Sequence, residues 1–266
     1  VSAFLGIVAA GIMLVILLGH IDLSVPWTIA ASAMLATAWG GAGAIPVGLL
    51  VGLGVGVFNG LGVAFLRIPS MIFTLGVNVV LRGFMVMLTG GFSPSSEPTD
   101  LMLLLAKGDV LGIPIPVIIW AVVGIAVSFM LRRTPLGRYM YAIGNREGAV
   151  YLSGINTRLV LVAAFAMCSM LAALAGLLIA GYSSKAFQAM GDPYLLPSIA
   201  AVVIGGTNIL GGSGKLSGTV MGTILIVLLQ SVLSVMQMPE AGRQIIYGIV
   251  IIAMLLAYGR GSRLRL

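Results

Sequence analysis

Long uncharged hydrophobic runs alternate with short clusters of Gly, Pro and polar residues along the chain and predict helical segments. The runs cover about 1–18, 26–39, 43–66, 69–89, 114–131, 157–181, 195–210, 216–237 and 244–259. A helix needs about 20 apolar residues to cross a bilayer. The runs at 26–39 and 195–210 fall short of that length and are bounded by Gly, Pro and polar residues, which predicts broken or half-spanning helices.

Composition places these segments in a membrane. The chain is 60% hydrophobic and only 8% charged, whereas soluble domains carry about 25% charged residues. The predicted fold class is therefore an all-α polytopic membrane protein with about nine hydrophobic segments. The single cysteine, Cys168, excludes a disulfide framework. The chain opens at Val1 directly in an apolar run, without the basic start of a signal peptide, so we expect one spanning helix to lie upstream.

Basic residues predict the orientation of the segments. The region 132–156 is rich in arginine and is therefore predicted to be cytoplasmic by the positive-inside rule. Strict alternation of all the segments then places ten of the 14 Lys and Arg residues at the cytoplasmic side: Arg67, Arg132, Arg133, Arg138, Arg146, Arg158, Lys215, Arg260, Arg263 and Arg265. The net charge of +7 is thus explained by orientation in a lipid bilayer, and no nucleic-acid partner is expected. Residues 90–113 are predicted to be periplasmic.

The two ends of the chain share a pattern. Residues 1–89 and 157–259 each have a long first helix, a short second helix with polar or glycine-rich flanks, and a glycine-rich third helix. Under the predicted orientation the two halves run in opposite directions, which favours an inverted-topology repeat of the kind found in transporters. Gly48, Gly52 and Gly56 lie at four-residue spacing, which allows close helix contact.

The glycine-rich stretch GGTNILGGSGKLSG, residues 205–218, superficially resembles a phosphate-binding loop. That motif would require Gly at 209 and Ser or Thr at 216, where the chain has Ile209 and Leu216. We therefore expect these glycines to serve a turn and close packing, and no nucleotide or other cofactor is predicted. The chain also lacks paired carboxylates, metal-spaced His or Cys residues and a nucleophile triad, so no catalytic or metal site is predicted.

Four stretches resemble the ribose-type permeases of ATP-binding-cassette (ABC) sugar importers. They are GHIDLSV from Gly19, IPSMIFTLGVNVVLRGFMVMLTGG at 68–91, TPLGRYMYAIGNREGAVYLSGIN at 134–156 and IAAVVIGGTNILGGSGKLSGTVMG at 199–222. The resemblance covers nearly the whole chain. It implies a single permease domain of about ten transmembrane helices that moves a monosaccharide such as ribose, xylose or galactose across the bacterial inner membrane by alternating access.

The resemblance also implies partners. A second permease subunit, identical or different, would complete the membrane dimer, a periplasmic sugar-binding protein would deliver the substrate, and a cytoplasmic ATP-binding subunit would hydrolyse ATP. The coupling segment to the ATPase would comprise Gly144, Asn145, Arg146, Glu147, Ala149, Leu152, Ser153 and Gly154. The chain departs from the family pattern at Pro26, where glycine is usual, and at Arg146.

Polar residues within the apolar runs or between the first two of them are candidates for the translocation pathway. They are Asp22, Ser24, Asn59, Thr74, Asn78, Thr207, Asn208 and Gln230. Each also needs a hydrogen-bond partner inside the bilayer, so interhelical bonding is the competing interpretation for each of them. For Asp22, capping of the helix that begins near Pro26 is favoured over direct contact with a solute.

Two other classes of function were weighed. An ion-coupled secondary transporter of a small polar solute would use intramembrane carboxylates, and Asp22 is the one candidate in the apolar runs. A membrane structural subunit without transport activity would have no use for broken helices. A permease without a catalytic site of its own therefore remains the favoured prediction.

Overall fold

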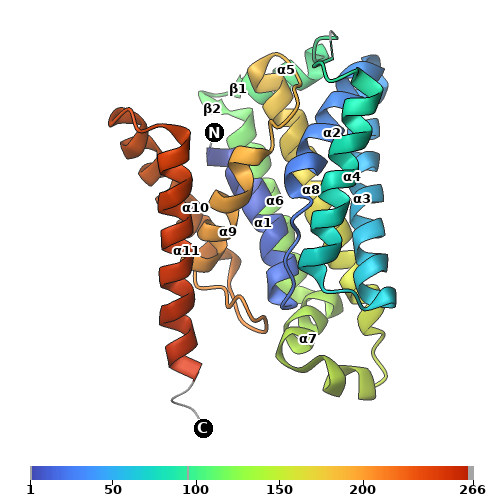
Figure 1. Ribbon diagram of the computed structural model, residues 1–266, viewed down its shortest axis with the longest axis vertical. Helices are drawn as coiled ribbons and strands as arrows, with labels where there is room; N and C mark the ends of the chain where they lie inside the picture. The colour runs from blue at the N-terminus through green and yellow to red at the C-terminus, as the bar shows by residue number, and fades with distance from the viewer. Residues whose placement is uncertain (1, 95, 263–266) are drawn as a thin grey trace.

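The computed structural model describes residues 2–94 and 96–262, and in this part of the chain it is almost entirely helical (Figure 1). The helices are α1 Ser2–Leu17, α2 Val25–Trp39, the 3-10 turn η1 Gly41–Gly43, α3 Ala44–Leu66, α4 Ser70–Thr89, α5 Asp100–Lys107, α6 Ile115–Arg133, α7 Pro135–Leu152, α8 Thr157–Ser183, α9 Asp192–Ile204, α10 Leu216–Val235 and α11 Glu240–Ser262. Strands β1, Asp109–Val110, and β2, Ile113–Pro114, form a small antiparallel hairpin. Arg263 and Arg265 lie outside the described residues.

Each predicted hydrophobic range contains a helix, and most boundaries agree within a few residues. The predicted range 195–210 extends too far at its C-terminal end, because α9 ends at Ile204 and Gly206 has a positive φ of 84°. The early end agrees with the turn expected at the glycines of 205–218. Among the described residues, five helices are long and apolar enough to cross a membrane: α3 with its preceding turn, α4, α6, α8 and α10. The short helices α2 and α9 have 15 and 13 residues, or roughly 20 Å each at 1.5 Å per residue.

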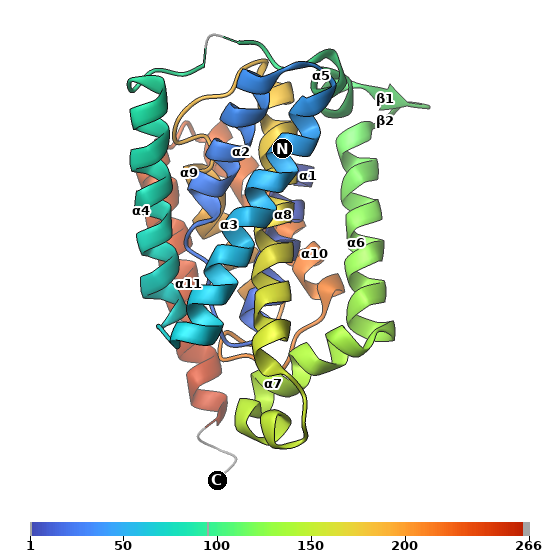
Figure 2. The same ribbon diagram turned by 90° about the vertical axis from the view of Figure 1, so that its right-hand side faces the viewer.

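Helix α1 occupies the centre of the molecule. Residues 3–17 are all buried, and α1 packs against α6, α8, α9 and α10. Figure 2 shows α4 and α6 flanking the central group that includes α1, α2, α3 and α8. A helix that is hydrophobic on every side is stable only where every side is covered, which explains why the uniformly apolar N-terminal run lies innermost.

Helices α3 and α8 are packed backbone to backbone through glycine. A Cβ atom at Gly52 would lie 2.6 Å from the carbonyl oxygen of Ser169, and one at Gly56 would lie 2.5 Å from that of Phe165. One turn further on, a Cβ at Gly60 would lie 2.5 Å from the Cα of Val162. The predicted close approach at the four-residue glycine spacing is therefore confirmed, and it extends beyond Gly56.

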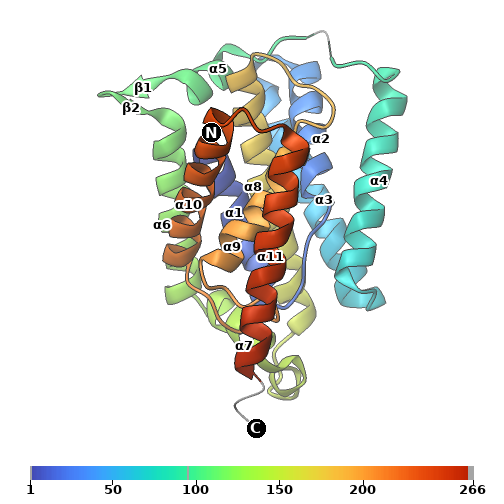
Figure 3. The same ribbon diagram turned by 60° about the vertical axis from the view of Figure 1, so that its left-hand side comes forward.

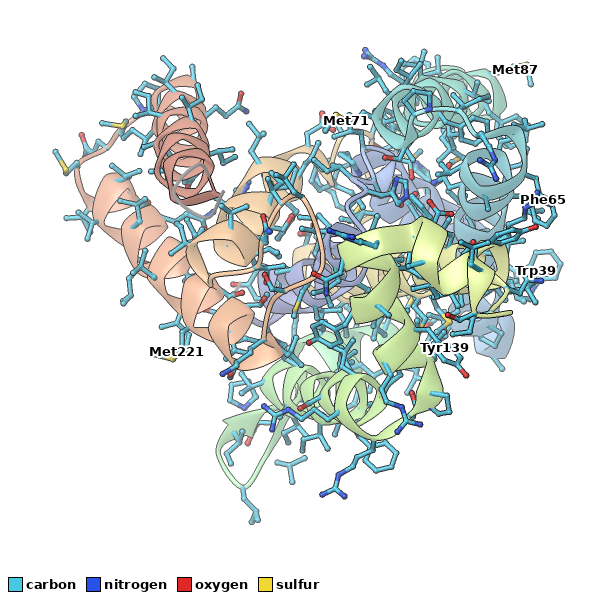
Figure 4. All side chains as sticks on the ribbon, turned by 90° about the horizontal axis from the view of Figure 1, so that it is seen from below. Trp39, Phe65, Met71, Met87, Tyr139 and Met221 are labelled. Carbon is cyan, nitrogen blue, oxygen red and sulfur yellow. The ribbon has the colours of Figure 1, made fainter. Side chains whose placement is uncertain are left out.

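The outer surface is apolar. Trp39, Met87 and Met221 are 70%, 71% and 66% exposed, and Figure 4 shows them together with Phe65 and Met71 around the periphery of the bundle. Soluble proteins rarely expose such continuous apolar surface. The exterior therefore fits a lipid solvent.

Helix α5 and the β-hairpin lie at one end of the bundle and α7 at the other (Figures 1 and 2). Helices α10 and α11 form one side, and the C-terminal end of α11 points toward the α7 end (Figure 3). The arginines that end α6, Arg132 and Arg133, lie beside α7 in the chain. The α7 end is thus the one that the positive-inside rule assigns to the cytoplasm.

This orientation predicts the accessibility of single cysteines in intact cells. Leu111 at the hairpin turn is 98% exposed, and Ser153 beyond α7 is also exposed. An impermeant maleimide should label Leu111→Cys strongly and Ser153→Cys only after the cells are permeabilised. Background labelling should be low because Cys168 is buried. Labelling of Ser153→Cys alone in intact cells would invert the orientation.

Candidate functional site

Two interruptions of the helical structure define the candidate site. The first break, residues 18–24, joins α1 to α2, and the second break, residues 205–215, joins α9 to α10. Pro26 lies in the first turn of α2, where its missing N–H leaves no hydrogen bond unmade. The departure from the family pattern at this position is therefore compatible with a regular start of α2.

Asp22 lies in the first break and is completely buried. One carboxylate oxygen, Oδ1, accepts hydrogen bonds from the Ser24 hydroxyl at 2.6 Å and the Ser24 backbone N–H at 2.9 Å. The other oxygen accepts from the Ser169 hydroxyl at 3.4 Å. Asn59 donates to the Ser24 hydroxyl at 2.7 Å and to Asp22 at 3.5 Å. The Asp22 cluster, defined as Asp22, Ser24, Asn59 and Ser169, thus ties the break to α3 and α8.

The predicted cap at Asp22 needs correction. Ser24 is the residue that precedes the first turn of α2, and Asp22 bonds to Ser24 rather than to an N–H group inside the helix. The reason is geometric, because Asp22 lies two residues ahead of the position from which a side chain reaches the first turn. Asp22 therefore shapes the entry to α2 without capping it.

Helix α4 supplies the hydrogen-bond acceptors that the first break requires. Ser70, Thr74 and Asn78 lie at four-residue spacing and so share one helix face. Their side-chain oxygens accept from the backbone N–H groups of Ile21 at 3.3 Å, Leu23 at 2.9 Å and Trp27 at 3.3 Å, respectively. Inside a bilayer an unpaired N–H costs several kcal/mol. Thr74 and Asn78, two of the pathway candidates, thus form interhelical bonds in this conformation.

The second break is a compact turn. The Asn208 side chain accepts from the Leu210 N–H at 3.1 Å, and the Asn208 N–H donates to the Ser213 carbonyl at 2.9 Å. Thr207 is fully buried, and its hydroxyl has no hydrogen-bond partner in the part of the chain that the structure describes. Gln230 lies four turns along α10 and is half-buried, so it is not part of either break. The pathway role of all eight candidates stays a prediction.

The two breaks contact each other at the C-terminal end of α1. The N–H of Gly212 donates to the carbonyl of Leu17 at 2.9 Å. A Cβ at Gly19 would lie 3.0 Å from the Leu210 carbonyl oxygen, and one at Gly211 would lie 2.8 Å from the Gly19 nitrogen. Gly19 and Gly211 also have φ values of 78° and 92°, which side chains disfavour. Glycine is therefore required here by conformation and by space.

Helix α7 completes this junction. The Tyr141 hydroxyl donates to the Gly214 carbonyl at 2.8 Å, and Asn145 donates to the Gly212 carbonyl at 3.3 Å. Burial raises the pKa of Tyr141, while Arg132 acts in the opposite direction, so the phenol remains protonated and can donate at neutral pH. A Cβ at Gly144 would collide with the Leu17 carbonyl oxygen and the Gly212 nitrogen. The junction, defined as Leu17–Gly19, Leu210–Gly214 and Tyr141–Asn145, joins three segments through backbone contacts.

Helix α7 changes direction at Arg146, whose φ of −155° and ψ of 88° are not helical. The coupling segment implied by the resemblance, 144–154, is not a separate short helix, because the helical region spans 135–152 in two parts divided by this kink. Beyond the kink, Ala149, Leu152, Ser153 and Gly154 are exposed. Leu152 is 86% exposed. The predicted coupling residues thus separate into a clamped part at Gly144 and Asn145 and an exposed part from Arg146 onward.

Glu147 connects the exposed part of α7 to its surroundings. Its carboxylate accepts a hydrogen bond from the Thr157 hydroxyl at 3.2 Å, at the start of α8. It also interacts electrostatically with His20 of the first break, and both residues line a pocket of about 220 Å³. Glu147 therefore provides a second contact between α7 and the first break, in addition to the packing of Gly144 against Leu17.

Sequence reasoning missed Ser70, Tyr141 and Ser169 as members of these networks. For Ser70 a signal was present, because it continues the four-residue spacing of Thr74 and Asn78. Tyr141 and Ser169 bond to segments 73 and 147 residues away. No local pattern indicates such partners.

A bundle of membrane-spanning helices in which two helical stretches are interrupted is typical of membrane transport proteins. Residues 1–255 match the profile of the family described as "Branched-chain amino acid transport system / permease component". The chain belongs to this permease family. No solved structure matches the chain.

Similar curated proteins cover nearly the whole chain. The ribose import permease protein RbsC of Haemophilus influenzae is 37% identical over 259 residues, which is 94% of this chain and 80% of that protein. RbsC of Bacillus subtilis is 34% identical, with 93% and 79% covered. The autoinducer 2 import system permease protein LsrC of Shigella flexneri is 36% identical, with 96% and 75% covered. The resemblance to ribose-type permeases is thereby confirmed.

The junction predicts different outcomes for two glycines on the same helix. Gly144→Ala places a methyl group against two backbone segments, whereas a Cβ at Gly148 meets nothing within 4 Å. Gly144→Ala should destabilise the protein by about 1–3 kcal/mol through overpacking. Gly148→Ala should be neutral or slightly stabilising. Thermal unfolding of the two detergent-purified variants measures the difference, and equal midpoints would contradict the observed contacts.

The acceptors on α4 predict the effect of one buried hydroxyl. Thr74→Val keeps the side-chain shape but leaves the Leu23 N–H without its acceptor, so it should cost about 1–3 kcal/mol. Thr223→Val is the matched control, because the equally buried Thr223 hydroxyl donates only to the Thr219 carbonyl of its own helix. Chemical denaturation should show a larger loss for Thr74→Val. A loss no greater than that of Thr223→Val would refute the role of α4.

Proposed function

We propose that this chain is the permease subunit of an ATP-driven importer in the inner membrane of a bacterium. The proposed cargo is a monosaccharide or a related hydroxyl-rich solute that moves toward the cytoplasm. Family membership and the names of the ribose and autoinducer 2 import permeases support this proposal. The observation that carries it is the α7 geometry, in which a helix outside the bundle is hydrogen-bonded to the second break and packs through Gly144 against Leu17, where the first break begins.

The polar residues of the breaks suit an uncharged solute. Apart from Asp22, which Ser24, Ser169 and Asn59 surround with donors, the candidates offer hydroxyl and amide groups. Such groups can exchange hydrogen bonds with sugar hydroxyls. Asp22, Ser24, Asn59, Thr74 and Thr207 are completely enclosed by protein here. Access of a solute would therefore need a second conformation in which α2 or α9 has moved.

Alternating access between two such conformations is the proposed mechanism. The short helices α2 and α9, each second in its half, support two inverted half-repeats at 1–89 and 157–259. The predicted long first helix is present only in the second half, because α1 has 16 residues and α8 has 27. The two halves start at opposite ends of the bundle (Figure 1). Rocking of one half against the other is the usual route in transporters built this way.

The second part of α7 is the proposed docking element for a cytoplasmic ATP-binding subunit. Ala149, Tyr151 and Leu152 are exposed apolar side chains beyond the Arg146 kink, and a solvated loop would have no need for them. Arg146 and Glu147 lie at the edge of this surface, where charges govern the choice of partner more than affinity. Force on this part of α7 would reach the breaks through Gly144 and Asn145.

Two further partners complete the proposed assembly. A second permease subunit, identical or different, would pack against this one within the bilayer. A periplasmic sugar-binding protein would dock at the opposite end, where α5 and the β-hairpin lie (Figure 2).

The docking surface on α7 can be disrupted without touching the bundle. Ala149 is exposed, so Ala149→Arg should fold normally while its added charge and bulk prevent ATPase docking. Co-purification of the ATPase should fall strongly, and substrate-stimulated ATP hydrolysis in proteoliposomes should be lost. Ser93→Arg, which adds the same charge at the exposed opposite end, should co-purify with the ATPase like the unmodified protein.

The outcome separates the proposed importer from an ion-driven transporter. Uptake by the complete complex should require ATP and should stop in Ala149→Arg. If the isolated permease takes up sugar in response to an ion gradient, or if Ala149→Arg transports normally, the proposed function is wrong.

A further inference from the structure

An apolar groove runs between α6 and α10 on the outside of the bundle. Its volume is about 820 Å³. The apolar lining side chains include Val117, Trp120, Ile125, Phe129, Val220 and Met221. Ile125, Phe129 and Met221 are 71%, 62% and 66% exposed, and Figure 4 shows Met221 at the outer edge of α10. In a bilayer this groove therefore opens toward lipid rather than toward the solute pathway.

The groove is polar and basic at one end only. Arg132 and Arg133, the last residues of α6, and Ser217, in the first turn of α10, line it there. Both arginines are exposed. This end is the cytoplasmic one by the orientation derived above. The groove thus pairs an apolar body inside the bilayer with two cationic groups at the headgroup level.

A second, polar pocket adjoins this basic end. It has a volume of about 540 Å³ and is lined by Lys215, Ser213, Tyr141 and the glycines of the second break. Ser217 lines both this pocket and the apolar groove, so the two meet at the start of α10. Lys215 adds a third positive charge, and the first N–H groups of α10 add the positive end of the helix dipole.

We propose that the groove and the adjoining pocket together bind one anionic phospholipid of the cytoplasmic leaflet. The acyl chains would lie along α6 and α10, and the phosphate would lie among Arg132, Arg133 and Lys215. Charge complementarity selects this occupant, because the cytoplasmic leaflet is rich in anionic lipids and basic pockets between transmembrane helices bind their headgroups. A free phosphate would leave the apolar groove uncovered, and a neutral lipid would leave the three cations without a counter-charge.

The position of the headgroup gives the lipid access to the junction. Tyr141 lines the polar pocket and donates to the Gly214 carbonyl of the second break. Arg132 is close enough to Tyr141 to act on it electrostatically. A phosphate at Arg132 and Lys215 would therefore hold the start of α10 and the clamped part of α7 together. Bound anionic lipid should stabilise the folded protein more than neutral lipid does.

The lipid preference can be measured on the purified full-length chain by native mass spectrometry. The probes are palmitoyl-oleoyl phosphatidylglycerol and the matching phosphatidylcholine, each titrated in detergent. The unmodified chain should retain one phosphatidylglycerol in preference to phosphatidylcholine. Replacement of Arg132 and Arg133 by Gln in one variant should lower phosphatidylglycerol affinity about thirtyfold, since each basic residue at the headgroup level contributes about 1 kcal/mol.

Matched variants distinguish the site from general charge attraction. Arg67→Gln combined with Arg146→Gln removes the same charge from two exposed cytoplasmic positions outside both cavities, and it should leave the affinity unchanged. Equal loss in the two double variants, or equal retention of the two lipids by the unmodified chain, would overturn the proposal. Excess inorganic phosphate should not displace the lipid, and displacement would point to a simple anion site.

A separate variant tests the acyl-chain part of the groove. Gly124 lines the groove, and a Cβ there meets nothing within 4 Å, so Gly124→Leu should fill the groove without disturbing the bundle. It should reduce phosphatidylglycerol retention and the thermal stabilisation that this lipid provides. Gly54→Leu on α3 is the control, because Gly54 is equally open but lies outside the groove. Unchanged retention by Gly124→Leu would refute the acyl-chain assignment, whatever the effect of the arginines.

Discussion

The structure depends on finding partners for backbone N–H groups where helices stop inside a bilayer. Residues 18–24 leave the helical hydrogen-bond pattern, and Ile21, Asp22 and Ser24 are buried there. Ser70, Thr74 and Asn78 on α4 supply the missing acceptors, and Asp22 accepts from Ser24 within the break itself. Because lipid offers no hydrogen bonds, a broken helix is possible only where such side chains surround it. The polar residues in and beside the apolar segments are therefore needed for the fold itself, whether or not they also contact a solute.

A second constraint is space at the cytoplasmic end of α1. There the two breaks and α7 approach so closely that Gly19, Gly144 and Gly211 leave no room for side chains. Close backbone contact makes this part of the molecule stiff, because small displacements would immediately produce collisions. The exposed part of α7 begins only two residues beyond Gly144, at Arg146. Only a few residues of α7 thus separate the proposed ATPase surface from the residues that touch the two breaks.

Much of this arrangement could be predicted from sequence, because lipid solvation imposes simple rules. Run length located the helices, and the spacing of Gly48, Gly52 and Gly56 indicated the close contact that α3 makes with α8. The prediction failed where local pattern does not decide structure. The glycines from 205 onward indicated a turn but not its first residue, so α9 ends at Ile204 rather than at 210. The partners of Tyr141 and Ser169 depend on tertiary contacts across many residues.

The enclosed position of α1 has a consequence for biogenesis. Helix α1 leaves the ribosome long before α8, α9 and α10, which cover it and begin only at Thr157 and beyond. Until then its apolar sides can be covered only by lipid or by the insertion machinery. Helix α2 has a shorter delay of the same kind, because its N-terminal donors wait for α4, which begins at Ser70. The early helices must therefore enter the bilayer in a provisional arrangement and exchange lipid neighbours for protein neighbours as translation ends. Premature termination before α8 would leave a chain that is inserted but not assembled, and membrane proteases would have access to it.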